Sequence, residues 1–442
     1  MTTIADGSGK TGFKETLLTP YAAAMLLLCI LVGAAEGYDV QAMALAAPLV
    51  RAAWKLSFQN MGLLIAASSV GLVLGSFLLS PVGDSYGRRP AILLGLLIAA
   101  IGTGTGAFAP DLPWLAATRL LAGVGLGLAL PNLLAMAMEL APHRLHALAI
   151  VLVSCGYPLG AAAGSAIASG LIPAHGHAAV FLVGGCGTAA ALVLCLFALP
   201  ESPSFLARKP ARSEELSTLL ARLGRTVTAQ TPQDKVKAEG AKGRVAALFA
   251  AERRRGTILL WLMNLGNVTL VYFFFSWLPS LIVARGLEAS TALRATALFS
   301  MVGVVGALIM VLTFARVGAV RVLAAAYVAA IAATVALSMY KGADSLFYLM
   351  IAVAGFSVIG SQFCLSAVVA QFYPADIRAT ASGFATGIGR AGAILTPIAV
   401  GAIIGAMGGS GQAFLIAVVP AAIALIGAVG LELSGDMRRK LA

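Results

Sequence analysis

The stretch Gly83-Asp84-Ser85-Tyr86-Gly87-Arg88-Arg89-Pro90 decides the fold, because it puts three charges and two glycines between two long apolar runs. The runs cover residues 58–81 and 91–109, and each is long enough to cross a bilayer. A charged loop this short cannot lie in hydrocarbon, so the stretch is predicted to be a tight turn at one membrane surface. Arg88 and Arg89 place that surface on the cytoplasmic side by the positive-inside rule, which fixes the sidedness of every other segment.

The composition is that of a membrane protein. Of the 442 residues, 60% are hydrophobic and only 11% are charged, and the mean hydropathy is +0.94. A soluble domain carries about 25% charged residues. The net charge of +12 does not indicate a nucleic-acid partner, because the loop assignment puts most Lys and Arg on one side of the bilayer. We therefore expect an all-α, multi-pass protein of the bacterial-type inner membrane.

Twelve transmembrane helices are predicted, in two halves of six. Their expected positions are 20–44, 57–80, 90–109, 113–140, 146–171, 178–199, 256–283, 294–316, 318–339, 344–372, 377–406 and 410–433. Two halves of six helices are the common plan of secondary transporters.

Residues 201–255 are the only long polar segment between the spans. We interpret them as a cytoplasmic connector between an N-terminal bundle in residues 1–200 and a C-terminal bundle in residues 256–442. The even number of spans then places both termini in the cytoplasm. The first 19 residues are polar, so no cleavable signal is expected.

The sequence gives no sign of a cofactor, a metal or an enzyme. The cysteines all lie inside apolar runs at no ligand spacing and are interpreted as small core residues: Cys29, Cys155, Cys186, Cys195 and Cys364. No nucleophile–base pair stands out either. We expect no metal site, no cofactor and no enzymatic activity.

Charges inside spans are costly and are candidates for function. Glu36 and Asp39 are three residues apart in the first span and share one helical face. Arg119 lies early in the fourth span and Arg390 midway along the eleventh. Glu139 closes the fourth span, where we favour a structural pairing with Arg144 or the basic turns.

The two carboxylates of the first span are candidates for proton coupling. A carboxylate that is removed from water beside a second one holds a proton more readily. Such a group can take a proton from one side and release it to the other. The alternative is that Glu36 and Asp39 are fixed ion-pair partners of Arg119 or another cation.

The two buried arginines are candidates for binding a carboxylate, since guanidinium does not lose its proton. Arg390 has no acidic neighbour along its own span, which makes it the better candidate for an anionic substrate. Arg119 is an equally good partner for Asp39.

Aromatic and polar side chains are candidates for lining a central cavity, because an aromatic ligand needs flat apolar faces with a few polar tips. The alternative for most of them is core packing or lipid contact. The candidates are Tyr38, Tyr272, Phe275, Ser361 and Gln362.

These motifs together resemble the major facilitator superfamily. The turn 83–89 is similar to its loop signature between spans two and three, with Ser85 where Arg is usual. The pattern Arg119-x-x-x-Gly123-x-Gly125-x-Gly127 is similar to the fourth-span motif of proton-coupled members. Pro200-Glu201-Ser202-Pro203 resembles the motif that closes the sixth span. The resemblance implies a twelve-helix carrier that works by alternating access.

Within the superfamily the chain resembles the aromatic acid–proton symporters. Their first span carries Asp-Gly-Phe-Asp, and here it reads Glu36-Gly37-Tyr38-Asp39. Ser276-Trp277-Leu278-Pro279 and residues 371–397 are similar to their seventh and eleventh spans. The resemblance implies import of a benzoate-like carboxylate with a proton, by a monomer. It also implies transport roles for the charges that match family positions: Asp84, Arg119, Glu139, Arg378 and Arg390.

Our hypothesis is that the substrate carboxylate docks near Arg390 or Arg119 and that its ring packs on aromatic side chains. Asp84, Arg88 and Arg89 would lock the cytoplasmic face in the outward-open state, with Arg378 as a gate or topology charge. Two alternatives stay open. One is a porter for another solute, such as a shikimate-like acid, a dicarboxylate, a sugar or an exported drug. The other is a membrane sensor that does not transport.

Overall fold

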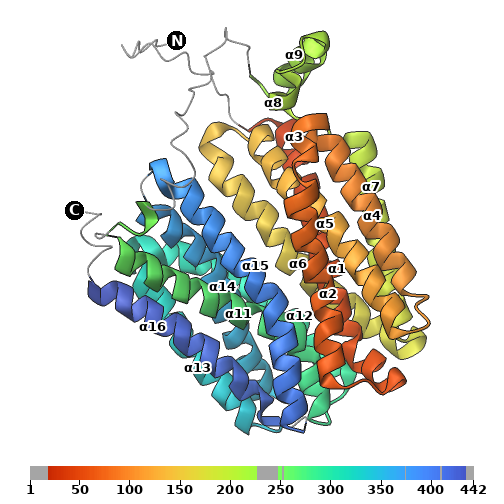
Figure 1. Ribbon diagram of the computed structural model, residues 1–442, viewed down its shortest axis with the longest axis vertical. Coiled ribbons are helices and arrows are strands. Elements are labelled where there is room, and N and C mark those ends of the chain that lie inside the picture. The colour runs from red at the N-terminus through yellow and green to blue at the C-terminus, as the bar shows by residue number, and fades with distance from the viewer. Residues whose placement is uncertain (1–17, 226–246, 251–252, 374, 409–410, 435–442) are drawn as a thin grey trace.

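The computed structural model describes residues 18–225, 247–250, 253–373, 375–408 and 411–434 (Figure 1). Every regular element in this part of the chain is a helix. Twelve of these helices are long and apolar enough to cross a membrane, which confirms the predicted all-α membrane fold. The chain is therefore a multi-pass membrane protein.

The bounds of the helices follow the predicted spans closely. In the N-terminal half the long helices are α1 (Pro20–Trp54), α2 (Phe58–Leu74, continued by the π-helix η1, Gly75–Leu79), α4 (Arg88–Gly106), α5 (Leu112–Leu140), α6 (His146–His175) and α7 (Ala178–Ala198). In the C-terminal half they are α11 (Arg254–Ala284), α12 (Ala289–Val317), α13 (Ala319–Met339), α14 (Ser345–Phe372), α15 (Ala375–Ala406) and α16 (Val418–Ser434, preceded by η4, Gly411–Ala417). Short helices are α3 (Val82–Tyr86), α8 (Pro203–Leu206) and α9 (Ser213–Arg222).

The first helix extends past its predicted end at residue 44 and reaches Trp54. The added turns contain one charge, Arg51, whose guanidinium lies 3.8 Å from the centroid of the Phe58 ring. A cation above an aromatic face is stabilised there. The helix then ends at Lys55, which adopts a left-handed φ of 51°, and Ser57 caps the start of α2 by accepting a hydrogen bond from the Asn60 amide.

Polar side chains begin several helices. Asp111 Oδ1 accepts a hydrogen bond from the Trp114 amide at 2.9 Å at the start of α5. Asp344 accepts from the amides of Leu346 and Phe347 at the start of α14. Each cap satisfies an amide that has no partner within the helix. These residues mark where the hydrophobic runs begin.

Within each half the helices approach closely at glycines. A Cβ on Gly156 of α6 would lie 2.6 Å from the Ile30 carbonyl oxygen of α1, and one on Gly95 of α4 would lie 2.6 Å from the Gly125 carbonyl oxygen of α5. Small residues at such crossings let helix backbones pack directly in a bilayer. The abundant glycines of the N-terminal half therefore pack helix against helix.

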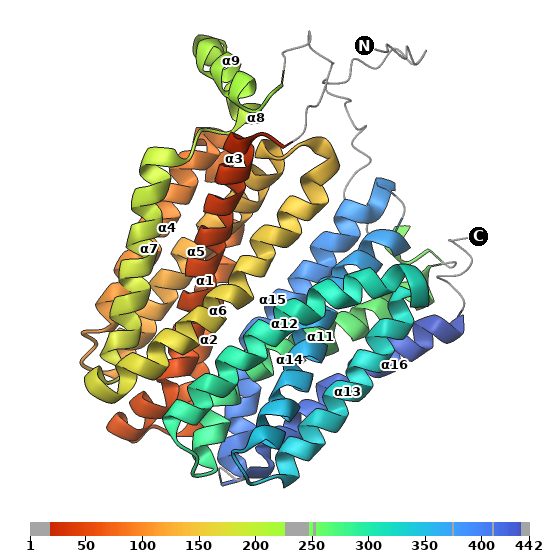
Figure 2. The same cartoon turned by 180° about the vertical axis from the view of Figure 1, so that it is seen from behind.

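The two halves pack together at the end remote from the chain termini. Here α2 packs against α15, α6 against α12 and α1 against α11. The rings of Phe58 and Trp277 lie 6.2 Å apart, and a Cβ on Gly401 would lie 2.6 Å from the Phe58 carbonyl oxygen. The ribbons of the halves diverge toward the end where α1 begins and where α8 and α9 lie (Figures 1 and 2).

The predicted connector at 201–255 begins with α8 and α9. Arg225 follows α9 and donates a 2.8 Å hydrogen bond to the Glu139 carbonyl, so this part of the segment is attached to the N-terminal half. Residues 226–246 and 251–252 lie outside the described part. The domain boundaries at 200 and 256 remain predictions.

Candidate functional site

A buried ion pair joins three helices of the N-terminal half. Asp39 of α1 lies 3.4 Å from Arg119 of α5, measured from Oδ1 to a terminal guanidinium nitrogen. Thr103 of α4 donates its hydroxyl hydrogen bond to the same carboxylate oxygen. All three side chains are completely buried. Of the two interpretations left open by the sequence, the structure shows Arg119 paired with Asp39.

This pair is not fully satisfied by its surroundings. Within the described residues, Asp39 Oδ2 and Arg119 Nε have no hydrogen-bond partner. The guanidinium carbon lies 4.9 Å from the centroid of the Phe181 ring, and its other terminal nitrogen donates to the Gly102 carbonyl at 3.4 Å. Buried charges are normally paired and fully hydrogen-bonded, and unmet atoms in such a site are costly. One oxygen of Asp39 thus remains without a hydrogen-bond partner among the described residues.

Tyr38 lies beside this pair but packs inside the N-terminal half. Its hydroxyl donates a 2.9 Å hydrogen bond to the Val180 carbonyl. A Cβ on Gly164 or Gly184 would lie 2.7 or 2.8 Å from its ring. The ring therefore fills the space between α6 and α7, a placement that favours packing over contact with a ligand.

A second group of polar side chains spans the two halves. Glu36 of α1 interacts electrostatically with Arg390 of α15. Tyr157 of α6 and Tyr272 of α11 interact with each other and with Glu36. Glu36 is 5% exposed. The structure thus brings together a carboxylate, a guanidinium and two phenols from four helices, and we call these four residues the interdomain cluster.

Arg390 reaches across to the N-terminal half. Its guanidinium donates a hydrogen bond to the Ser76 hydroxyl of η1 and lies 5.6 Å from the centroid of the Phe77 ring. Among the described residues it forms no ion pair within 4 Å. A guanidinium that is held by a neutral hydroxyl can exchange that partner for a carboxylate, which binds it more strongly.

Aromatic and amide groups border the interdomain cluster. The rings of Tyr157 and Phe275 lie 5.5 Å apart, edge to face, and Gln41 donates to the Phe275 carbonyl at 3.0 Å. Gln362 accepts a 2.6 Å hydrogen bond from Asn267. These contacts place the predicted residues Phe275 and Gln362 on α11 and α14 of the C-terminal half.

Ser361 forms no hydrogen bond to these groups among the described residues. It is completely buried and donates to the Ser357 carbonyl of its own helix at 2.6 Å. Tyr157, Gln41 and Thr103 were not predicted from the sequence. All three are polar side chains inside apolar runs, which was the available signal.

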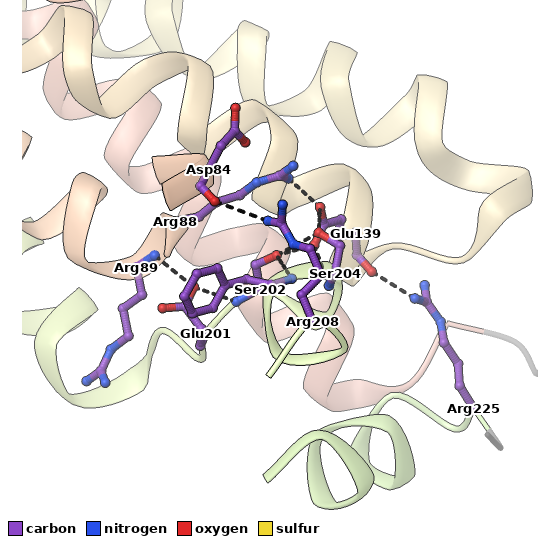
Figure 3. A network of polar contacts seen from close by, with 10 residues as sticks. Asp84, Arg88, Arg89, Glu139, Glu201, Ser202, Ser204, Arg208 and Arg225 are labelled. Carbon is purple, nitrogen blue, oxygen red and sulfur yellow. Dashed lines mark hydrogen bonds and ion pairs between the residues drawn. The ribbon is translucent and has the colours of Figure 1, made fainter. Parts of the chain in front are cut away.

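A third network lies on the side of the termini and involves the loop from which the fold was predicted (Figure 3). Arg88 forms a 2.5 Å ion pair with Glu139. Ser202 and Ser204 donate their hydroxyl hydrogen bonds to the same carboxylate at 2.5 and 2.6 Å. The expected pairing of Glu139 with a basic turn is therefore present, through Arg88.

Glycine is required in this loop. Gly87 has a φ of +112°, and a Cβ there would collide with the Glu201 carboxylate. That carboxylate accepts a hydrogen bond from the Arg89 amide at 3.1 Å. A larger residue would both strain the backbone and displace Glu201.

The Asp84 carboxylate stands apart from these pairs. It is exposed and points away from Arg88 and Glu139 (Figure 3). Its hydrogen bonds to other described residues come from the backbone: its amide donates to the Pro81 carbonyl at 3.1 Å and its carbonyl accepts from Arg208 at 3.3 Å. The predicted lock with Arg88 and Arg89 is not formed in this conformation, in which the halves meet at the opposite end. The side chain of Arg378, the other predicted gate residue, lies outside the described part.

The described residues hold no group of three or more His, Cys, Asp or Glu side chains that could bind a metal ion. Four cysteines are buried as expected, but Cys186 is exposed. The expected core position is therefore wrong for Cys186, which is exposed on α7.

Comparison with known proteins agrees with this architecture. The profile of the Major Facilitator Superfamily matches residues 27–397. The chain is 32% identical to the 4-hydroxybenzoate transporter PcaK of Acinetobacter baylyi over 89% of this chain and 86% of the relative. It is 33% identical to a gallate transporter of Pseudomonas putida over 88% and 86%.

A solved structure shares the fold. It is that of a bacterial homologue of the human lysosomal transporter Spinster, with a TM-score of 0.71 at 16% identity, covering 96% of this chain and 97% of that one. The predicted absence of enzymatic activity is confirmed, since fold and relatives are those of transporters. The chain belongs to the Major Facilitator Superfamily, and its relatives over most of its length are aromatic acid transporters.

Proposed function

We propose that this protein is a proton-coupled symporter that imports an aromatic carboxylate, of the benzoate or hydroxybenzoate class, by alternating access. The observation that carries the proposal is the interdomain cluster, in which Arg390 stands opposite Glu36 with phenol side chains beside them. The names of relatives that transport 4-hydroxybenzoate and gallate support this substrate class.

The substrate carboxylate would bind Arg390. It would displace the Ser76 hydroxyl and replace a neutral partner with a charge-assisted pair. The aromatic ring would lie against Tyr272, Tyr157 and Phe275, whose rings come from both halves. Because Arg390 and Ser76 belong to different halves, binding would also remove one link between them.

The proton would enter through Glu36. A deprotonated Glu36 repels an anion that approaches Arg390, and charges roughly 8 Å apart at an effective dielectric constant of about 20 interact by about 2 kcal/mol. Protonation of Glu36 removes this repulsion, so that substrate and proton bind together. The affinity for the substrate would then fall at high pH, where Glu36 is deprotonated.

Asp39 would carry the proton through the conformational change. Its Oδ2 is unpartnered among the described residues, and protonation would weaken the pair with Arg119. The pair lies where α1, α4 and α5 meet, so its loss would loosen the packing of the N-terminal half during reorientation. Binding at Arg390 and proton release at Asp39 would thus be separate steps.

The cytoplasmic loop would control the opposite conformation. If the protein lies in a bacterial inner membrane with both termini in the cytoplasm, the conformation described here is inward-facing. When the halves close on that side, Asp84 would contact the C-terminal half while Arg88 and Glu139 keep the loop in place. Arg378 would take part from α15. The architecture would work as a monomer.

The test is uptake of labelled 4-hydroxybenzoate into proteoliposomes under an inward proton gradient. We expect accumulation that a protonophore abolishes and that benzoates, but not sugars or dicarboxylates, compete. Arg390→Ala should raise the half-saturating concentration at least tenfold, while Arg294→Ala, an exposed arginine on α12, serves as the charge control. Uptake of a non-aromatic acid alone would instead identify a porter for another solute, and binding without counterflow would identify a sensor.

A further inference from the structure

A groove on the outer surface of the C-terminal half is separate from the Asp39–Arg119 pair, the interdomain cluster and the network of the loop at 83–90. It has a volume of about 570 Å³ and is bordered by α12, α13 and α14. Figure 2 shows α12 and α13 at the front of that half. Its lining is almost entirely apolar, with Arg321 as the one charged residue. None of the interdomain cluster lines it, so the groove is a separate feature that faces the membrane.

The depth of the groove corresponds to one leaflet of the bilayer. Its lining on α12 runs from Val302 to Val317, the last residue of that helix. Fifteen residues of α-helix rise about 22 Å, whereas one leaflet is about 15 Å of hydrocarbon plus its headgroup region. On α13 the lining residues lie between Arg321 and Ala329, in the first half of the helix. The groove therefore reaches from the membrane surface on the side of the termini to about the bilayer centre.

Small residues on α13 create the hollow. Ala325, Ala326 and Ala329 line it, and each presents only a methyl group where a leucine would fill the space. The opposite wall includes Ile309 and Phe356. An apolar channel that is open to hydrocarbon accepts a flexible acyl chain without the loss of any polar contact.

The mouth of the groove is positively charged. The Arg321 side chain is 54% exposed, and its Nε donates to Glu432 at 2.8 Å. Its terminal nitrogens donate to no described protein group. Arg316, which is exposed, lies on the last turn of α12, one residue before Val317. Among the described residues at this mouth, two arginines and one glutamate leave a net positive charge at the level of the headgroups, which attracts anionic lipid.

We propose that this groove is a binding site for one anionic phospholipid. An acyl chain lies along α12, α13 and α14, and the phosphate binds Arg321 and Arg316. The groove admits a chain but offers no broad face, whereas a second copy of the protein needs about 800 Å² on each partner. The site is independent of the transport cycle proposed above.

The test is native mass spectrometry of the purified full chain, with phosphatidylglycerol and phosphatidylcholine of matched acyl chains added in turn. We expect the protein to retain one phosphatidylglycerol in preference to phosphatidylcholine. Arg321→Gln should reduce this retention about fivefold, whereas Arg294→Gln, an exposed arginine near the opposite end of α12, should not. Glu432→Gln, which removes the competing carboxylate, should increase it.

A second pair of variants tests the groove itself. Ala325→Trp fills it from an exposed position and should abolish retention of both lipids. Val328→Trp, on an exposed part of α13 outside the groove, should leave retention unchanged. Equal retention of the two lipids by the wild-type protein would overturn the proposal. So would wild-type retention by Ala325→Trp, or a dimer that Ala325→Trp dissociates, which would make the groove a subunit interface.

Discussion

Replacing Thr103 by valine removes a hydroxyl that donates to Asp39 and keeps the size and branching of the side chain. The change lies in a completely buried site, so water does not replace the lost donor. A hydrogen bond to a charged group contributes about 1.5–3 kcal/mol, and a tenfold change in proton affinity corresponds to about 1.4 kcal/mol. The substitution therefore removes about 1.5–3 kcal/mol of stabilisation from the charged Asp39 carboxylate.

The measurement is counterflow of labelled substrate in proteoliposomes at equal internal and external pH, over a range of pH values. In Thr103→Val we expect the pH at which counterflow declines on the alkaline side to rise by about one to two pH units. Thr188→Val is the matched control, because Thr188 is 1% exposed and its hydroxyl has no partner among the described residues. An unchanged profile in Thr103→Val, or an equal displacement in Thr188→Val, would refute the role assigned to Asp39.

Three further predictions concern other parts of the molecule. Glu36→Gln should bind substrate with an affinity that no longer falls at high pH and should lose accumulation driven by a proton gradient; equilibrium binding and uptake on one preparation check this, and a retained pH dependence would exclude Glu36. Gly87→Ala should cost about 1–3 kcal/mol through the strained φ alone and lower the melting temperature, whereas Gly405→Ala, with no atom within 4 Å of the added Cβ, should not. Burial lowers the pKa of His177 from its usual 6.5, so the unfolded chain binds more protons and stability falls as pH drops below about 6.5; melting curves of His177→Gln should show a weaker fall, and an identical slope would contradict the assignment.

The sequence by itself determined the class of the protein and the course of its chain. Hydrophobicity along twenty residues is a local sum, so each span could be recognised without knowledge of its neighbours. The charged loop at 83–90 likewise marked the end of one span and the start of the next, whereas the side of the membrane on which it lies stays a prediction. The length of α1 beyond residue 44 could not be recognised, because Arg51 is accommodated by the ring of Phe58, which belongs to the next helix.

The sequence also indicated which charges matter but not what they touch. Asp39, Arg119 and Arg390 stood out because a charge within an apolar run is costly wherever the helix points. Whether Arg119 pairs with Asp39 depends on the rotation and depth of α1 and α5, which no single helix encodes. Thr103 and Tyr157 drew no attention, since a hydroxyl in a span can always bond to its own helix.

Only the tertiary structure separated the two polar groups. It placed Asp39 and Arg119 within one half and brought Glu36 and Arg390 together from different halves, although Glu36 and Asp39 are neighbours on one helix. It also showed the Asp84 carboxylate in no ion pair among the described residues, while Arg88 binds Glu139. The physical reason is that hydrophobic burial along the chain selects the helices, whereas the few polar contacts between them depend on how glycine-lined surfaces pack in three dimensions.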